Sequence, residues 1–144
     1  MVNKKWCCKK IELIEPKEHL HKSYLSESEQ DLGEIVNVGP KWKVIIAYYF
    51  CYEAVYSLFM KCGIKCEIHD CTIELMPLFG FSEKERNFLK ELKELREENQ
   101  YYLKRNEIEQ ERRIKEFVFK CKEISENLTH DKINKIREDL KDDK

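Results

Sequence analysis

The sequence predicts an all-α protein, an up-and-down antiparallel bundle of about five to six helices. Two observations support this prediction. Apolar residues recur at intervals of three and four along most of the chain, which is the spacing that places them on one face of a helix. The 144 residues include only four glycines and three prolines, clustered at "VGP" (38–40), Gly63 and "MPLFGF" (76–81). Because these residues interrupt helices, we expect the helices to lie between them.

The first two predicted helices lie on either side of "VGP". One runs from about Glu18 to Val36, with an apolar stripe at Leu20, Tyr24, Leu32 and Ile35. The next, from about Lys41 to Cys62, is the most apolar part of the chain and is predicted to be the central helix of the core. Its stripe contains Val44, Ala47, Tyr48, Cys51, Val55, Leu58 and Phe59.

The second half of the chain carries signals for helix starts. A short helix is expected from about Ile68 to Met76, before Pro77. Ser82 with Glu85 forms a capping box for a long helix that reaches about Arg105, with a buried face at Phe88, Leu92, Leu95 and Tyr102. The next helix follows Asn106 and Glu109, which repeat that pattern, and its stripe contains Ile114, Phe117, Val118, Cys121 and Leu128.

A charged helix over about 130–141, with Ile133, Ile136 and Leu140 as its apolar seam, completes the prediction. No repeat or low-complexity linker divides residues 1–144, so one domain is expected. The 27 basic and 28 acidic residues leave no overall positive field for a long nucleic acid. Neither an export signal nor a membrane span is recognisable, so we expect a cytoplasmic protein in which the seven cysteines are reduced thiols.

The segment "CGIKCEIHDC" (62–71) gathers Cys62, Cys66, His69 and Cys71. Zinc sites usually bring together two separated ligand pairs, whereas these four residues form a single run across a helix end. We therefore predict small buried thiols and a histidine near a helix cap, with no metal and no cofactor; a zinc site is the alternative.

Signatures of common enzymes are absent from the sequence. No G-x-S-x-G nucleophile motif and no glycine-rich phosphate loop occurs. The four histidines, His19, His21, His69 and His130, stand in polar or terminal surroundings. A hydrolase that pairs Cys66 or Cys71 with a distant histidine is an alternative, although it needs a specific electropositive environment to activate the thiol.

The segment "LREENQYYLKR" (95–105) is the strongest candidate for a binding site. Its arginine can bind phosphate, and its tyrosines can hydrogen-bond or stack on a base. Arg96 and Tyr101 lie about 140° apart on a straight helix, so they share a site only if the helix bends or a second subunit contributes. The alternative is a solvated arginine beside two half-buried aromatic residues.

Tyr49, Glu53 and Tyr56 form a second candidate surface, since their spacing places them in a row opposite the core stripe of their helix. They predict either an interface with a partner or a wider core.

Together these segments resemble the HEPN-domain family, small all-helical proteins associated with nucleotides and RNA. "KSYLSESEQDL" (22–32) is similar to the first helix of the family. "AYYFCYEAVYSLFMKCGI" (47–64) with "IHDCTIELM" (68–76) is similar to its second helix, glycine corner and following histidine. "LREENQYYLKR" occupies the place of its arginine signature, and the resemblance spans about residues 17–128. It implies a helical bundle that forms a homodimer with its signature helices facing each other.

The family's ribonucleases carry Arg, four to six residues, then His. Arg96 matches the arginine, whereas Tyr101 stands where a histidine is expected. A phenol is a poor base at neutral pH, so the departure favours weak or lost cleavage. The resemblance then implies a binding module with contacts to RNA, nucleotide or a second subunit through Tyr49, Glu53, Tyr56, Arg96, Gln100 and Tyr102.

The resemblance also implies a partner, a minimal nucleotidyltransferase that adenylylates Tyr101 or Tyr102 in a toxin–antitoxin pair. The alternative function is a metal-independent endoribonuclease toxin that acts on RNA such as tRNA, with Arg96 and Tyr101 as its catalytic residues.

Overall fold

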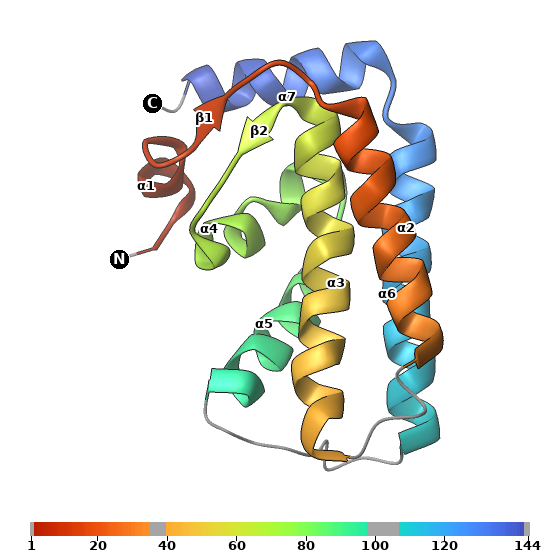
Figure 1. Ribbon diagram of the computed structural model, residues 1–144. Helices are drawn as coiled ribbons and strands as arrows, with labels where there is room; N and C mark the ends of the chain where they lie inside the picture. The colour runs from red at the N-terminus through yellow and green to blue at the C-terminus, as the bar shows by residue number, and fades with distance from the viewer. Residues whose placement is uncertain (1, 35–39, 98–106, 143–144) are drawn as a thin grey trace.

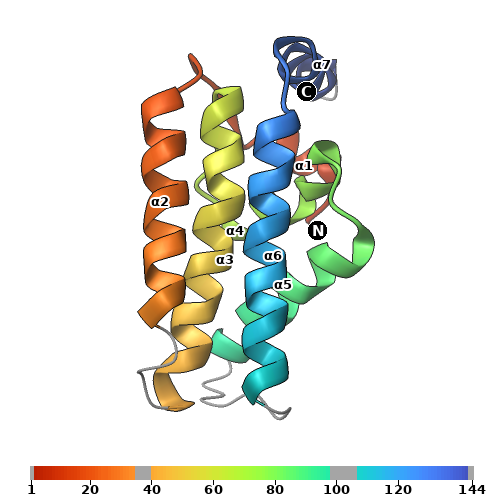
Figure 2. The same cartoon turned by 90° about the vertical axis from the view of Figure 1, so that its right-hand side faces the viewer.

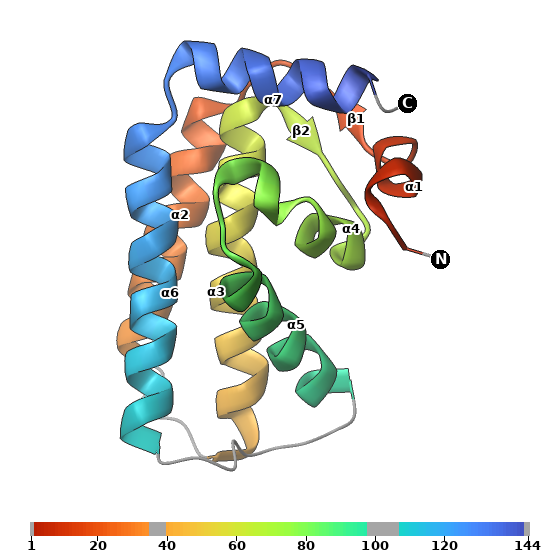
Figure 3. The ribbon, with the colours of Figure 1, turned by 180° about the vertical axis from the view of Figure 1, so that it is seen from behind.

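The computed structural model describes residues 2–34, 40–97 and 107–142. The fold of these residues is all-α, as predicted, and three long helices, α2, α3 and α6, run side by side (Figure 1, Figure 2). Helix α5 lies obliquely against α3, and α7 crosses the end of the bundle (Figure 3). The elements are α1 (Lys4–Cys8), β1 (Glu12–Leu13), α2 (Glu18–Glu34), α3 (Pro40–Cys62), β2 (Ile64–Lys65), α4 (His69–Glu74), the 3-10 helix η2 (Met76–Phe79), α5 (Glu83–Glu97), α6 (Glu107–Asn127) and α7 (His130–Asp142).

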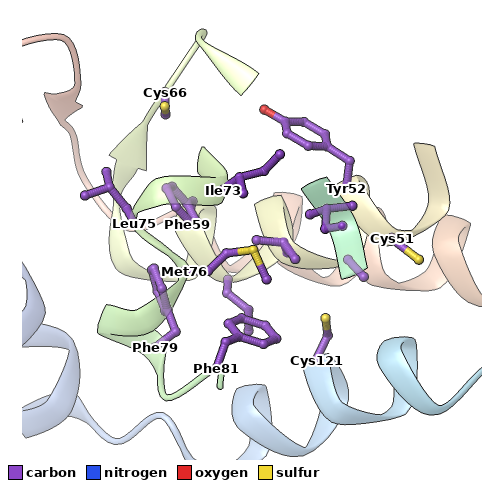
Figure 4. Packing of buried hydrophobic residues seen from close by; sticks show 14 of the residues in the cluster. Cys51, Tyr52, Phe59, Cys66, Ile73, Leu75, Met76, Phe79, Phe81 and Cys121 are labelled. Carbon is purple, nitrogen blue, oxygen red and sulfur yellow. The ribbon is translucent and has the colours of Figure 1, made fainter. Parts of the chain in front are cut away.

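Helix α3 is the central helix, as its apolar stripe predicts. It packs against α2, α5, α6 and α7, so it is buried on several faces. The described members of its predicted stripe are all fully buried: Ala47, Tyr48, Cys51, Val55, Leu58 and Phe59. Figure 4 shows the rings of Phe59, Phe79 and Phe81 close to Met76 and Cys121, where α3, η2 and α6 meet.

The start of α5 confirms the predicted capping box. The Glu85 backbone N–H donates to Ser82 Oγ at 3.2 Å, and the Ser82 N–H donates to Glu85 Oε1 at 2.8 Å. The described part of α5 ends at Glu97, and its predicted continuation to Arg105 lies outside the described residues. The predicted buried stripes of the last two helices are confirmed at Ile114, Phe117, Val118, Cys121, Leu128, Ile133, Ile136 and Leu140.

The N-terminal segment folds onto the corner between α3 and α4, which the sequence analysis did not predict. Strands β1 and β2 pair antiparallel, with Leu13 opposite Ile64. Arg137 of α7 fastens this corner, since its Nη1 donates to the carbonyl oxygens of Ile14, Cys62 and Gly63 at 2.8 to 2.9 Å. Gly63 has φ +71°, and a Cβ at this position would lie only 2.2 Å from the Ile14 carbonyl oxygen, so a side chain has no room there.

The cysteines differ in part from the prediction that all are reduced. Cys7 of α1 and Cys71 of α4 form a disulfide, with their Cα atoms 5.3 Å apart. The prediction was wrong for this pair because 64 residues separate the two cysteines in the sequence and only the fold brings them together. The other five are buried thiols: Cys8, Cys51, Cys62, Cys66 and Cys121.

The segment around residue 66 contains no arrangement that suits a metal ion. Within the described parts of the chain, no group of three or more histidine, cysteine or carboxylate side chains is arranged to hold one. Cys71 is in the disulfide, and the Cys66 thiol donates to the Ile68 carbonyl at 3.3 Å. Over the same described residues, no helix is both long enough and apolar enough to cross a membrane.

Candidate functional site

Arg96 of α5 lies against two adjacent tyrosines of α3. Its Nη1 donates to the Tyr49 hydroxyl at 2.9 Å, and its guanidinium carbon lies 4.4 Å from the centre of the Tyr48 ring. Arg96 and Tyr49 belong to the two surfaces that the sequence analysis proposed separately. The fold brings them together because α5 crosses α3. Tyr49 is 42% exposed, so the contact lies at the surface.

His69 joins this contact from α4, of which it is the first residue. Its Nδ1 lies 2.7 Å from the Tyr48 hydroxyl, within hydrogen-bond distance. Its ring stacks on Tyr52 with 4.0 Å between ring centres and 14° between planes. The Tyr52 hydroxyl is itself 3.1 Å from Thr72 Oγ1, so α4 holds both the imidazole and the ring beneath it. We call Tyr48, Tyr49, Tyr52, His69 and Arg96 the Arg–His–Tyr patch.

Burial keeps His69, Tyr48 and Tyr52 neutral at physiological pH, because it lowers the pKa of the imidazole and raises the pKa of the two phenols. Burial lowers the pKa of His69, and the nearby positive charge of Arg96 lowers it further. Burial raises the pKa of Tyr48 well above its usual value, although the Arg96 charge opposes this shift. The patch therefore presents one fixed cation beside a neutral imidazole that can accept a proton and phenols that can donate hydrogen bonds.

Arg96 differs from Arg86 and Lys93, two other cations of α5, in how its charge is balanced. Lys93 lies 3.0 Å from Asp70 Oδ1 and also pairs with Glu97, and Arg86 pairs with Glu74 and Glu83. Among the described residues, the ion pair of Arg96 is a distant one, 4.0 Å to Glu97. The guanidinium can therefore turn its remaining N–H donors toward a ligand.

A groove of about 380 Å³ adjoins the patch between α4 and α5. Asp70 and Lys93 line it, and Asp70 follows His69 directly in α4. The other residues that line this groove are Val2, Ile73, Glu74, Arg86, Lys90, Glu94 and Glu97.

The other predicted site residues lie elsewhere or outside the described chain. Tyr56 is half-buried: its hydroxyl accepts the Cys66 backbone N–H at 3.2 Å, and its ring meets Tyr24 of α2 edge-on. Glu53 is also half-buried. Tyr49, at one end of the predicted row, is exposed. Tyr56, at the other end, packs inside the protein, as the alternative of a wider core describes. Gln100, Tyr101 and Tyr102 lie outside the described residues.

Sequence reasoning missed His69 as a partner of Arg96. The family pattern places a histidine after Arg96 along the same helix, whereas this imidazole comes from α4. The signal in the sequence is the resemblance of "IHDCTIELM" to a segment with a histidine after the glycine corner.

A second histidine, His21, contradicts the expectation that all four stand in polar or terminal surroundings. It is 4% exposed. Its Nδ1 lies 3.0 Å from the Ser57 carbonyl, which can only accept, so Nδ1 carries the proton. Its Nε2 therefore accepts from the Ser125 hydroxyl at 2.8 Å. Lys61 Nζ donates to the Ser125 carbonyl at 2.7 Å. We call His21, Ser57, Lys61 and Ser125 the His21 junction; it joins α2, α3 and α6.

Comparison of the chain with protein-family models, with curated proteins and with solved structures gives no match.

Proposed function

We propose that the protein is a homodimeric binding module of HEPN type that engages RNA or a nucleotide through the Arg–His–Tyr patch. The observation that carries the proposal is the contact between Arg96 and the exposed Tyr49. It sets a phosphate-binding cation beside an aromatic ring on which a base can stack. An RNA or nucleotide ligand also favours the cytoplasm as the place of action.

The chemistry of the patch suits single-stranded rather than double-stranded nucleic acid. Stacking of one base on an aromatic side chain contributes about 1–3 kcal/mol and requires an unpaired base. The chain has no net positive charge to hold a long duplex. We therefore expect short single strands or mononucleotides to bind, with an affinity that falls as salt rises.

The experiment is fluorescence anisotropy with a fluorescein-labelled single-stranded RNA, comparing the full chain with Arg96→Ala and Arg112→Ala. Arg112 is the matched control, since it is an exposed arginine of α6 whose described ion pair, with Glu116, is 3.8 Å long. We expect Arg96→Ala to weaken binding about tenfold or more, from loss of a charge-assisted phosphate contact. Equal weakening by both variants would mean diffuse electrostatic attraction and would contradict the proposal.

A second candidate function, metal-independent cleavage of RNA, is favoured by the position of His69. A neutral imidazole near Arg96 can take the proton of an attacking ribose hydroxyl while the guanidinium stabilises the phosphate charge. Tyr101, the residue at the signature position, would then not need to act as the base.

RNA incubated with the protein in the presence of a chelator tests this candidate. Cleavage that is lost in both Arg96→Ala and His69→Gln, and kept in Arg112→Ala, would establish the ribonuclease. If the RNA stays intact and its binding depends on Arg96, the ribonuclease is rejected and the binding module is supported.

The proposal includes a minimal nucleotidyltransferase as partner, with Tyr101 or Tyr102 as the residue that it adenylylates. Its support is the resemblance of "LREENQYYLKR" to the family signature. A nucleotidyltransferase gene beside this one is the first observation to make. Co-expression followed by mass spectrometry of the intact chain would then detect adenylylation, and Tyr101→Phe and Tyr102→Phe would identify the residue.

A further inference from the structure

The Cys7–Cys71 disulfide fastens the short helix that carries His69. Helix α4 spans His69–Glu74, so the imidazole of the patch and the sulfur of Cys71 lie within one turn of each other. The other sulfur belongs to α1 at the N-terminus, which packs on α4 (Figure 3). A covalent bond therefore joins the N-terminal segment to the helix that positions the histidine.

Helix α4 has little stability of its own. It is six residues long, too short to be stable by its own hydrogen bonds, and its N-cap residue, Ile68, provides no side-chain cap. Besides the contacts of His69, three polar side-chain contacts join it to α3 and α5: Thr72 to the Tyr52 hydroxyl at 3.1 Å, Asp70 to Lys93 at 3.0 Å and Glu74 to Arg86 at 3.4 Å. Ile73 is also buried in the core. Surface ion pairs such as those of Asp70 and Glu74 contribute little.

The contacts of His69 with Tyr48 and Tyr52 are sensitive to small movements of α4. The 2.7 Å between His69 Nδ1 and the Tyr48 hydroxyl, and the 4.0 Å stack on Tyr52, both join α4 to α3. Hydrogen bonds weaken steeply with misalignment, so a shift of about 1 Å in α4 separates the imidazole from Tyr48.

We propose that the Cys7–Cys71 disulfide is a redox-sensitive positioning device for His69. In the oxidised chain α1 holds α4 against α3 and the imidazole is fixed on Tyr48; in the reduced chain α4 is released and His69 moves away from the patch. The consequence for RNA rests on the function proposed above, whereas the movement of His69 does not.

The redox step needs a dithiol as reductant. One thiolate of the dithiol attacks a sulfur of the disulfide and breaks the S–S bond, and its second thiol then displaces the mixed disulfide. Two electrons and two protons pass to Cys7 and Cys71, which become thiols, and the dithiol becomes a disulfide. Both cysteines are fully buried, so α1 must first open locally; its five residues make this cheaper than global unfolding.

Titration of His69 followed by NMR tests the proposal, with the resonance assigned from His69→Gln. The thiol count defines the samples: five thiols in the oxidised chain and seven after reduction with a dithiol. On reduction we expect the pKa of His69 to rise toward the ordinary value, because the ring becomes hydrated. Cys7→Ser should behave like the reduced chain. Cys8→Ser, which alters the adjacent buried thiol of α1 outside the disulfide, should behave like the oxidised chain.

An identical His69 titration in oxidised chain, reduced chain and Cys7→Ser would overturn the proposal. If Cys7→Ser fails to fold, the comparison of the oxidised and the reduced natural chain still decides the question. Anisotropy with labelled RNA on the same samples separates the two proposals. Weakening on reduction by about fivefold or more supports both. If the pKa of His69 rises on reduction but the chain binds no RNA in either redox state, the result supports the positioning device and rejects the proposed function.

Discussion

His21 and His69 are both packed against α3, yet their surroundings differ. At the His21 junction both ring nitrogens are used, one by the Ser57 carbonyl and the other by the Ser125 hydroxyl, and the ring is 4% exposed. His69 uses Nδ1 toward Tyr48, its ring is partly exposed, and a cation and an exposed phenol lie beside it. Burial lowers the pKa of both. A perturbed pKa alone therefore does not identify a functional histidine.

The neighbours of each ring distinguish structure from function. The partners of His21 come from the chain itself and satisfy it completely, which fixes α2 and α6 on α3. At the His69 site, the neighbouring Arg96 guanidinium donates to Tyr49 and has further N–H donors that can reach a ligand near the surface. We infer that the first site stabilises the fold and the second binds a ligand, and the following experiments test this difference.

The largest expected effect is on stability, in His21→Leu. Leucine cannot accept from Ser125, which leaves a buried hydroxyl without its partner. We expect the free energy of unfolding to fall by about 2–4 kcal/mol in urea titrations. His69→Leu, at a partly exposed position, should lower it by about 1 kcal/mol. Equal losses of unfolding free energy in His21→Leu and His69→Leu would contradict the proposed difference between the two histidine sites.

Acid should destabilise the protein mainly through the buried His21. The pKa of His21 is lowered in the folded state, so as pH falls below the ordinary value of 6.5 the unfolded chain binds the proton first. The free energy of unfolding then falls with pH, by at most about 1.4 kcal/mol per pH unit for one histidine, until pH passes below the folded pKa. Urea titrations between pH 5 and 7 measure it. His21→Gln should flatten the dependence more than His69→Gln, since His21 is the more buried.

Ser125→Ala tests the hydrogen bond that His21 Nε2 accepts at the His21 junction. It removes the hydroxyl that donates to His21 Nε2 but keeps the backbone carbonyl that accepts from Lys61. We expect a loss of about 1 kcal/mol in the free energy of unfolding, the contribution of one buried hydrogen bond. RNA affinity should not change, and a change would mean that the two histidine sites are coupled.

The smallest effect on stability is expected for Tyr49→Phe. This substitution removes the hydroxyl that accepts from Arg96 at the surface, so the free energy of unfolding should change by about 0.5 kcal/mol or less. RNA binding should weaken by about threefold, since Arg96 loses the group that orients it. Tyr24→Phe, on the half-buried ring that meets Tyr56, is the control and should leave binding unchanged.

The helices were predictable because their signals are local. The capping box at Ser82 and the stripe of α6 each depend on residues within a few turns, and both appear in the structure as expected. The pairing of Arg96 with Tyr49 was not predictable in this way, although each was chosen as a candidate. Their positions along the chain give no information about the angle at which α5 crosses α3.

Periodicity and local chemistry were sufficient to predict the all-α class and the central position of α3, and to select Arg96 and Tyr49 as candidates. Three contacts required the folded structure: the bond of Cys7 to Cys71, the burial of His21 against Ser125, and the patch that His69 shares with Arg96. Each of these is a contact between residues far apart in the chain, and such contacts depend on how helices pack rather than on where they begin and end.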